Sequence, residues 1–334
     1  MSEMKDVSES KKTFNVFGIL NYSVYIVTVA FIIFVAFQNK NFFTISNLLL
    51  VLQQSSPYFI AATGMAFVMM GGSIDISLGQ NMLFSAAVGV NIQQLLMASG
   101  MKPNTVLLLT LSVIAGMIAG GFVGFINGVS IAKFNIIPFI ATLATSNIIR
   151  GLALVINKGE SLNFEGLSRI TNYQIGGYFP LVLIPAIILL IISNFVARSL
   201  PFGRRVLAIG NSAENAHKVG IKVVKNKIII QTLGGAAAGV CGVLTAGQMG
   251  IVGQGHGSGM EYVIISGCTL GGISLRGGRG SIIPGAVVGV LLVQMIINGL
   301  TMINASPFIY TIVRGVVIFM AVMIESIKYE GVLK

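Results

Sequence analysis

The chain has 334 residues, of which 54% are hydrophobic and only 9% are charged, and its mean hydropathy is +0.89. Soluble domains carry about 25% charged residues, so this composition excludes a soluble globular domain and predicts an all-α protein that crosses a membrane several times. The formal net charge is +11, but the positions of the basic residues argue against a nucleic-acid-binding protein, and no nucleic acid is expected as a partner.

Apolar segments of the sequence predict ten membrane-spanning helices within one domain. Residues 1–19 are polar and predict a tail with no cleavable signal. Residues 20–327 form a single predicted transmembrane domain, and residues 328–334 form a second tail. The ten predicted spans are 20–37, 46–70, 80–97, 105–128, 136–156, 178–197, 228–248, 261–275, 281–300 and 307–325.

The Lys and Arg residues are distributed unevenly between the two sides of this topology. With the N-terminus inside, fifteen of the 21 fall in cytoplasmic segments, four fall outside, and Arg150 and Arg314 fall within spans. Cytoplasmic loops of membrane proteins carry an excess of Lys and Arg. The pattern therefore predicts that both termini are cytoplasmic and that the number of spans is even.

The segment MGGSIDISLG connects the second and third predicted spans and contains a carboxylate, Asp75. Paired Gly71 and Gly72 would cost about 2 kcal/mol relative to alanine inside a helix, so they predict a break. Asp75 can cap the next helix, where a negative charge is favoured, or it can pair with Arg150 or Arg314. Direct contact with a substrate is the alternative.

Glycines recur at every fourth residue on several predicted spans. Small residues at this spacing let helix backbones approach closely in lipid. The plain interpretation is that these glycines pack helices together inside one subunit. The alternative is that they form an interface between two subunits. The pattern comprises Gly116, Gly120, Gly124 and Gly128, with the pairs Gly235 and Gly239, Gly267 and Gly271, and Gly285 and Gly289.

Two distant segments share a short pattern. NG followed by PFIAT occurs within 127–142, NG followed by PFIYT occurs within 298–311, and an Arg-Gly pair follows each, at Arg150 and Arg314. In the predicted topology the helices that follow run in opposite directions, as in an inverted repeat that relates spans 2–5 to spans 7–10. Chance, combined with the preference of proline for a first helical turn, is the alternative.

The longest predicted cytoplasmic loop is 198–227. Asn211 or Ser212 can cap a short helix within it, and Gly220 can end that helix. The short helix is either ordinary loop structure or a docking element for a cytoplasmic partner.

Motifs for catalysis and for cofactor binding are missing from the sequence. It contains no GxSxG, GxxxxGK[ST], GxGxxG, CxxC or HExxH, so we expect no catalytic, cofactor-binding or metal site in this chain. The acidic residues near the membrane, Asp75, Glu261 and Glu325, do not form a proton relay. This disfavours an ion-coupled secondary transporter.

Four sequence blocks together resemble a known family. They are GGSIDISLG (71–79), NIIPFIATLATSNIIRGLA (135–153), PFGRRVLAIGNSAENAHKVGI (201–221) and GGISLRGGRGS (271–281). In this order they resemble the permease subunits of ribose-, galactose- and arabinose-type ABC importers, and the resemblance covers nearly the whole chain from about residue 20. The departures are mild, since Ser73 is an extra residue in the first block and Leu78 replaces the common valine.

The resemblance implies a fold, a location and a set of partners. The fold would be similar to that of the cobalamin importer permease, with spans 2–5 and 7–10 related by pseudo-symmetry. A second permease subunit, a cytoplasmic ABC ATPase that binds ATP and Mg, and an extracytoplasmic sugar-binding protein would complete the importer. It would lie in the lipid bilayer of a bacterial cytoplasmic (inner) membrane. The chain itself would be no enzyme and would bind no cofactor.

The resemblance also implies roles for particular residues. The short helix of the 198–227 loop corresponds to the family's coupling helix, which docks into the ATPase. Its residues are Ser212, Glu214, Asn215, Ala216, His217, Lys218 and Gly220. The signature loop of the family corresponds to Gly71, Gly72, Asp75, Ser77 and Gly79.

A neutral sugar in transit needs hydrogen-bond donors and acceptors rather than charges. Candidates for the translocation path are Gln53, Asn81, Ser85, Asn147, Gln248 and Asn298, with Gln54, Ser55 and Gln294 beside them. Hydrogen bonding between helices is the alternative for each residue. We expect import of a monosaccharide, a ribose-like pentose or a hexose, by alternating access. The alternatives are a nucleoside, an autoinducer-like furanosyl compound or a branched-chain amino acid as cargo, and an ion-coupled sugar transporter.

Overall fold

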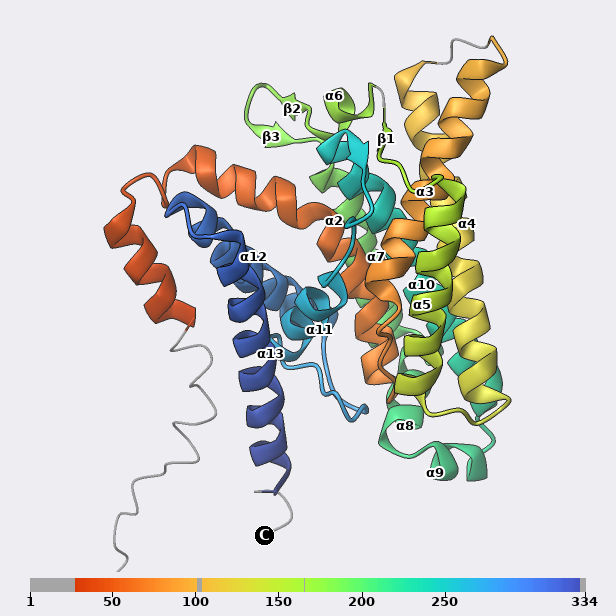
Figure 1. Cartoon of the computed structure of the whole chain (residues 1–334). Coiled ribbons are helices and arrows are strands. Elements are labelled where there is room, and N and C mark those ends of the chain that lie inside the picture. Colours follow the sequence, from red (N-terminus) through yellow and green to blue (C-terminus); the bar gives the residue numbers. More distant parts are fainter. Residues whose placement is uncertain (1–27, 101–103, 165, 331–334) are drawn as a thin grey trace, which may run out of the picture.

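Nearly all of the described chain is helical (Figure 1). The computed structural model describes residues 28–100, 104–164 and 166–330. The predicted tail 1–19 and the beginning of the first predicted span lie outside the described residues, as do residues 331–334. In chain order the helices are Thr28–Gln38, α2 (Ile45–Met70), α3 (Leu78–Ala98), α4 (Thr105–Ala132), α5 (Pro138–Ile156), α6 (Leu167–Thr171), α7 (Leu183–Ser199), α8 (Pro201–Asn211), α9 (Ala213–Lys218), α10 (Val223–Met249), α11 (Met260–Leu270), the π-type turn η1 (Ile282–Ala286), α12 (Val287–Met302) and α13 (Pro307–Glu330).

The length and composition of these helices identify a multi-pass membrane protein. Each of the ten predicted spans contains a helix within the described residues. Four helices there are long and apolar enough to cross a membrane, namely α4, α5, α10 and the segment Ile282–Met302. The pair α7 and α8 adds a fifth if the two helices, bent by 69°, count as one span. The all-α membrane fold is therefore confirmed, and the count of ten spans stays a prediction.

The helix α11 is shorter than the predicted span 261–275, because it ends at Leu270 and Gly271 follows as its C-cap. Its 11 residues extend over about 16 Å, roughly half of the hydrocarbon thickness of a bilayer. α11 lies in the middle of the molecule (Figure 1). Because it is too short to cross a bilayer, at least one end of α11 lies among the other helices.

The helix α8 corrects the expectation that 198–211 is part of a loop. Leu200 has extended dihedral angles of φ −88° and ψ 153°, as expected for a residue that precedes proline. Pro201 then occupies the first turn of α8, where its missing N–H is not needed. A side chain at Gly203 would overlap the backbone of Ala197, with its Cβ 2.6 Å from the Ala197 Cα. The sharp bend between α7 and α8 therefore depends on proline and glycine together.

Two small antiparallel sheets lie at the end of the molecule opposite to α8 and α9 (Figure 1). In the first sheet Leu162 lies opposite Val252, and in the second Gln174 lies opposite Pro180. These short strands tie connecting segments together at one end of the helices. The pairs are β1 (Leu162–Asn163) with β4 (Ile251–Val252) and β2 (Gln174–Ile175) with β3 (Phe179–Pro180).

The helix α10 packs against α2, α3 and α4, and its closest approach is to α4. A Cβ atom on Gly120 would overlap the carbonyl oxygen of Gly235 and lie 2.9 Å from the Cα of Gly239. A Cβ atom on Gly235 would lie 2.8 Å from the Cα of Gly124. The glycines predicted to share a face of α4 therefore pack inside one subunit, which confirms the plain interpretation of their spacing.

We predict that Gly120→Ala destabilises the protein, because its methyl group has no space against α10. Overpacking of this kind costs about 1–3 kcal/mol, which a lower midpoint of thermal unfolding in detergent would report. Gly121→Ala is the matched control, since a Cβ atom there would lie 3.6 Å from the nearest atom, in Ala236. Equal midpoints for the two variants would show that the α4–α10 contact is not close.

Candidate functional site

The signature loop begins where α2 ends. Gly71 is the C-cap of α2, and its N–H donates to the carbonyl of Phe67. Gly72 has φ +75° and its N–H donates to Met69, while the N–H of Ser73 donates to Val68. Glycine adopts this left-handed conformation without the steric penalty of other residues. The predicted helix break at the glycine pair is confirmed.

Asp75 organises the turn that leads into α3. Its side chain is 2% exposed. The carboxylate Oδ1 accepts hydrogen bonds from the N–H of Ser77 (2.8 Å) and from its hydroxyl (2.6 Å). The Nδ2 of Asn127, on α4, donates to the same hydroxyl at 2.9 Å. The carboxylate and hydroxyl thus connect the loop to α4.

This geometry decides between the structural roles expected for Asp75. Burial raises the pKa of the Asp75 carboxyl above its ordinary value, and the hydrogen bonds from Ser77 offset part of that rise. Within the described part of the chain no salt bridge reaches Asp75, so the predicted pairing with Arg150 or Arg314 is not formed. Asp75 closes a turn before α3 by accepting from Ser77. The N-cap residue of α3 is Ser77, and no described side chain caps the first amides of the helix, so the predicted capping of α3 by Asp75 is wrong.

Gly79 lies in the first turn of α3 and contacts the chain before α11. A Cβ atom on Gly79 would overlap the carbonyl of Gly257 and the carboxylate of Glu261. The glycine therefore permits α3 to approach the start of α11, and its place in the signature loop has a packing reason.

Three glycine-rich segments are in close contact at a point that we call the glycine junction. It is formed by Gly72, Gly210, Gly277 and Gly278. A Cβ atom on Gly277 would lie 2.6 Å from the Cα of Gly72. A Cβ atom on Gly210 would overlap the carbonyl of Met70 and the N–H of Gly278. The N–H of Gly278 donates to the Met70 carbonyl at 2.9 Å. The end of α2, the end of α8 and the 271–280 loop are thus in direct backbone contact.

The 271–280 loop is also held by α13. The carboxylate Oε1 of Glu325 accepts hydrogen bonds from the N–H of Leu275 (2.6 Å) and the hydroxyl of Ser274 (2.5 Å). In the sequence, Glu325 is a carboxylate near the end of a predicted span, and residue spacing does not predict this contact. The glycine-rich loop is visible in the sequence, but its partner on α13 is not.

The short helix expected in the cytoplasmic loop is present as α9, directly after α8. The hydroxyl of Ser212 caps it by accepting the N–H of Asn215 at 3.2 Å. Glu214 and Lys218 form an ion pair at 2.6 Å between side chains that are 78% and 66% exposed. Gly220 ends the helix with φ +84°. Both predicted helix ends are confirmed.

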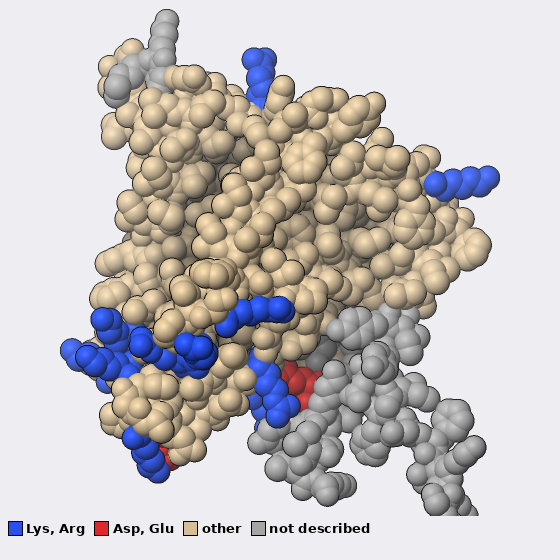
Figure 2. Space-filling model, turned by 180° about the vertical axis from the view of Figure 1, so that it is seen from behind, with Lys and Arg blue, Asp and Glu red and all other residues tan. Residues whose placement is uncertain are grey.

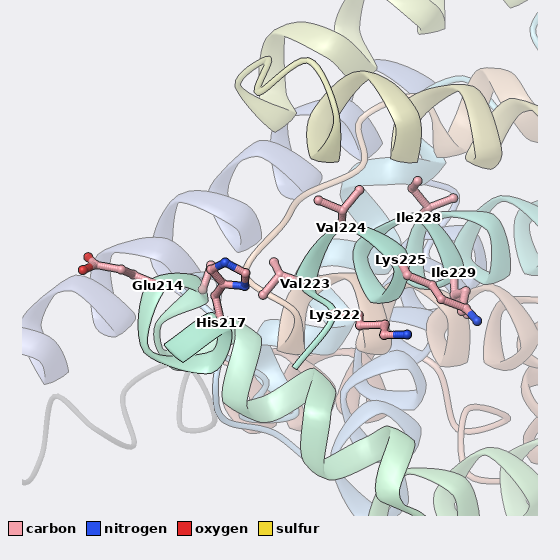
Figure 3. Close-up of a pocket in the computed structure, with 9 residues that line it drawn as sticks. Glu214, His217, Lys222, Val223, Val224, Lys225, Ile228 and Ile229 are labelled. Atoms are coloured by element: carbon pink, nitrogen blue, oxygen red, sulfur yellow. The ribbon is translucent and has the colours of Figure 1, made fainter. Parts of the chain in front are cut away.

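A groove of about 750 Å³ lies between α9 and the first turns of α10. Figure 3 shows His217 beside Val223, with the Glu214 side chain directed away from the groove. Val224 and Ile228 add apolar surface to its wall. The groove and the exposed α9 form one surface at this end of the molecule.

Positive charge gathers at the same end. Figure 2 shows most of the visible Lys and Arg side chains in the lower part of the molecule, where Figure 1 places α8 and α9. Basic residues are concentrated on the cytoplasmic side of membrane proteins. The charge distribution agrees with the side on which the sequence places the 198–227 loop.

Two of the six path candidates come together near the small sheets. The Nε2 of Gln248 donates to the backbone carbonyl of Gln53 at 3.0 Å. The side-chain amide of Gln53 donates to Asn172 at 2.9 Å and accepts from Gln174 at 3.0 Å. These amides form a polar cluster at the end of the molecule opposite to α9.

The other four path candidates do not join that cluster. Asn81 is fully buried and donates to the carbonyls of Gly120 and Gly235 at 3.2 Å, and Ser85 donates to Asn81. Asn298 exchanges two hydrogen bonds of 3.0 Å with Asn47. Asn147 is exposed and donates to a carbonyl of its own helix. These bonds support the alternative of contacts within and between helices.

The described residues show where the cysteines and the other metal-ligating side chains lie. Cys241 and Cys268 are buried free thiols on different helices. No group of three His, Cys, Asp or Glu side chains occurs in the ranges that the structure covers. The chemistry of the site is therefore that of hydrogen bonding and of close backbone contact.

Comparisons with known proteins agree with the resemblance. A family described as "Branched-chain amino acid transport system / permease component" matches residues 47–322. The chain is 35% identical to the ribose import permease protein of Bacillus subtilis over 304 residues, which cover 89% of this chain and 90% of the relative. It is 33% identical to the L-arabinose transport system permease protein of Escherichia coli K12, over 81% of this chain and 80% of the relative.

A third relative is the galactose/methyl galactoside import permease protein of Escherichia coli K12. It is 30% identical over 321 residues, which cover 92% of this chain and 94% of the relative. No solved structure matches the chain.

We predict that Asp75→Ala destabilises the protein, because it removes the acceptor of both Ser77 hydrogen bonds in a buried turn. The loss is about 1–3 kcal/mol, measured as a lower midpoint of thermal unfolding in detergent. Asp75→Asn is the matched control, since its side-chain oxygen can still accept both bonds, and it should lower the midpoint less. The turn-forming role would be refuted if the two variants unfolded at the same temperature.

Proposed function

The chain belongs to the family described as branched-chain amino acid transport system / permease component, and we propose that it is the membrane-spanning permease subunit of an ATP-binding-cassette importer for a monosaccharide. One observation carries the choice of cargo. Relatives named for ribose, arabinose and galactose import match over 81% or more of this chain. A ribose-like pentose or a hexose is therefore the proposed substrate.

The proposed importer divides the work between several chains. This chain lacks the GxxxxGK[ST] motif of P-loop ATPases, so ATP and Mg are assigned to a cytoplasmic ATPase. A second permease subunit completes the path through the membrane, and an extracytoplasmic binding protein delivers the sugar. Residues 20–327 form the single permease domain. The excess of basic residues near α8 and α9 supports a bacterial cytoplasmic membrane location with both termini in the cytoplasm.

The helix α9 is the proposed coupling helix. It is capped at both ends, and its charged side chains are exposed, so it offers a preformed surface to the ATPase. It follows α8 directly, and the end of α8 lies in the glycine junction against α2 and the 271–280 loop. Glu325 connects that loop to α13. A displacement of α9 by the ATPase would therefore reach α2 through backbone contacts and α13 through the Glu325 side chain.

An inverted repeat is the proposed basis of alternating access. Asn135 has φ +55° three residues before the start of α5, and Asn304 has φ +51° three residues before the start of α13. In Figure 1 α5 runs away from the end that carries α9 and α13 runs toward it. α10 packs on α4, as α2 packs on α12. Equivalent turns and equivalent packing in opposite orientations support a relation between spans 2–5 and spans 7–10.

The family description itself motivates a second candidate cargo, a branched-chain amino acid. Co-purification from native membranes, followed by ATPase assays with binding protein, separates the candidates. We expect a co-purifying ATPase that is stimulated by binding protein loaded with D-ribose, L-arabinose or D-galactose. Stimulation by leucine alone would support the second candidate. A permease that purifies alone and accumulates sugar under an ion gradient would overturn both.

We predict that Glu214→Arg uncouples ATP hydrolysis from uptake in the reconstituted importer. The exposed ion pair with Lys218 contributes little to stability, about 0–1 kcal/mol, so the variant should fold. Reversing a charge in a docking surface should lower the amount of sugar imported per ATP by about tenfold or more.

The control for this prediction is Lys218→Ala, which breaks the same ion pair but leaves the Glu214 carboxylate in place. We expect it to keep most of the coupling ratio. Normal uptake by Glu214→Arg would remove α9 from the docking surface.

A further inference from the structure

Arg314 is a charged side chain on the predicted membrane span 307–325, and it does not pair with Asp75. It lies on α13, and its guanidinium approaches the start of α11, where a Cβ atom on Gly259 would lie 3.3 Å from its Nη1. Its Nε is buried and has no hydrogen-bond partner among the described residues. Ionisable groups within a membrane are costly and are usually functional, so an unsatisfied guanidinium nitrogen needs an explanation.

Arg314 lines a cavity of about 600 Å³ between α11 and α13, which we call the Arg314 cavity. Its polar lining is Ser258, Tyr262, Thr311 and Arg314, and Gly315 and Phe319 lie among its other lining residues. Thr311, Arg314, Gly315 and Phe319 share one face of α13, at the i, i+3, i+4 and i+8 positions. Gly315 leaves this face open, since nothing lies within 4 Å of the place of its Cβ.

A narrow cleft of about 10 Å³, room for roughly one water molecule at most, adjoins this cavity and shares Tyr262 and Arg314 with it. The cleft reaches Ser266 of α11, whose side chain is 2% exposed and whose hydroxyl has no partner among the described residues. Buried hydroxyl groups are almost always hydrogen-bonded. Two polar groups without partners, Arg314 and Ser266, thus lie at the same place between two apolar helices.

The charges near the cavity favour a neutral ligand over an anion. Arg314 is the one charged residue among the described residues that line the cavity. A phosphate or carboxylate ligand would find no second cation among them. The hydroxyl groups of Ser258 and Thr311 and the partly exposed ring of Tyr262 instead suit a polyhydroxyl compound.

We propose that the Arg314 cavity contacts the hydroxyl groups of the monosaccharide during its passage, an inference that rests on the proposed function. Arg314 donates hydrogen bonds to sugar hydroxyls with its fixed guanidinium geometry. The hydroxyl groups of Ser258, Thr311 and Tyr262 exchange hydrogen bonds with neighbouring sugar hydroxyls, and the Tyr262 ring covers an apolar face of the sugar. Few contacts are made, which lets the cargo leave again.

The experiment uses the complete importer in liposomes, with saturating binding protein and radiolabelled D-ribose, L-arabinose or D-galactose. Arg314→Gln should lower the maximal uptake rate by about tenfold or more, while sugar-stimulated ATPase activity stays within about twofold. Arg150→Gln is the matched control, since Arg150 follows the other PFI motif but is exposed on α5. It should change uptake by less than about twofold.

Two further variants keep the inference testable if Arg314→Gln does not fold. Tyr262→Phe removes only the phenol oxygen and should lower the maximal uptake rate by about threefold or more. Thr311→Cys places an accessible thiol in a chain whose Cys241 and Cys268 are buried. Transported sugar should slow the labelling of this thiol by a polar maleimide.

The outcomes separate the inference from the function on which it rests. Wild-type importer that moves none of the three sugars would overturn both. Wild-type uptake together with normal uptake by Arg314→Gln and Tyr262→Phe would overturn the inference alone. If the Thr311→Cys thiol cross-links two permease copies, a second subunit fills the cavity. If phosphatidylglycerol protects the thiol in the absence of sugar, a lipid fills it. Either result would also overturn the inference.

Discussion

Direct contact between helix backbones at glycine is the constraint on which this structure depends. Lipid tails are as apolar as the helix surfaces, so the association of helices in a membrane relies on close packing and on hydrogen bonds between helices. Gly120 and Gly124 of α4 face Gly235 and Gly239 of α10 with no space for a methyl group. α10 is therefore fixed at the centre of the fold, and α2 and α3 pack around it.

The same constraint acts at the end that carries α9. In the glycine junction, the ends of α2 and α8 and the 271–280 loop touch mainly through backbone atoms, and the Asn211 side chain lies against Gly278. Side chains can change rotamer and absorb a displacement, whereas backbone atoms in contact cannot. The junction links α8, which precedes the exposed α9, to α2, and the Glu325 carboxylate links the loop to α13. These contacts suit the coupling role proposed for α9.

Polar side chains in this apolar chain fall into two groups. Asn81 and Asn298 are buried, and their hydrogen bonds join different parts of the helix bundle. Arg314 and Ser266 carry buried polar atoms without partners among the described residues. An unsatisfied polar group is costly in a low-dielectric interior. The hydrogen bonds of Asn81 and Asn298 therefore stabilise the fold, and the unsatisfied atoms of Arg314 and Ser266 support the contact proposed between this place and the cargo.

The sequence by itself determined the class of protein, the positions of nearly all helices, the break after α2 and the short helix α9. These features follow from local properties, namely hydropathy, glycine and proline positions and capping residues, which need no knowledge of distant contacts. It placed residues 201–211 in the cytoplasmic loop 198–227, whereas they form the helix α8. It also grouped Gln53 with Asn81 and Asn147 as one path.

Only the tertiary structure decided which residues meet. The glycine junction joins residues near 72, 210 and 277, and the cavity of Arg314 joins residues near 260 and 314. The reason is physical, because such contacts depend on how long helices cross. A helix pattern gives the face that is buried, but not the neighbour against which that face packs.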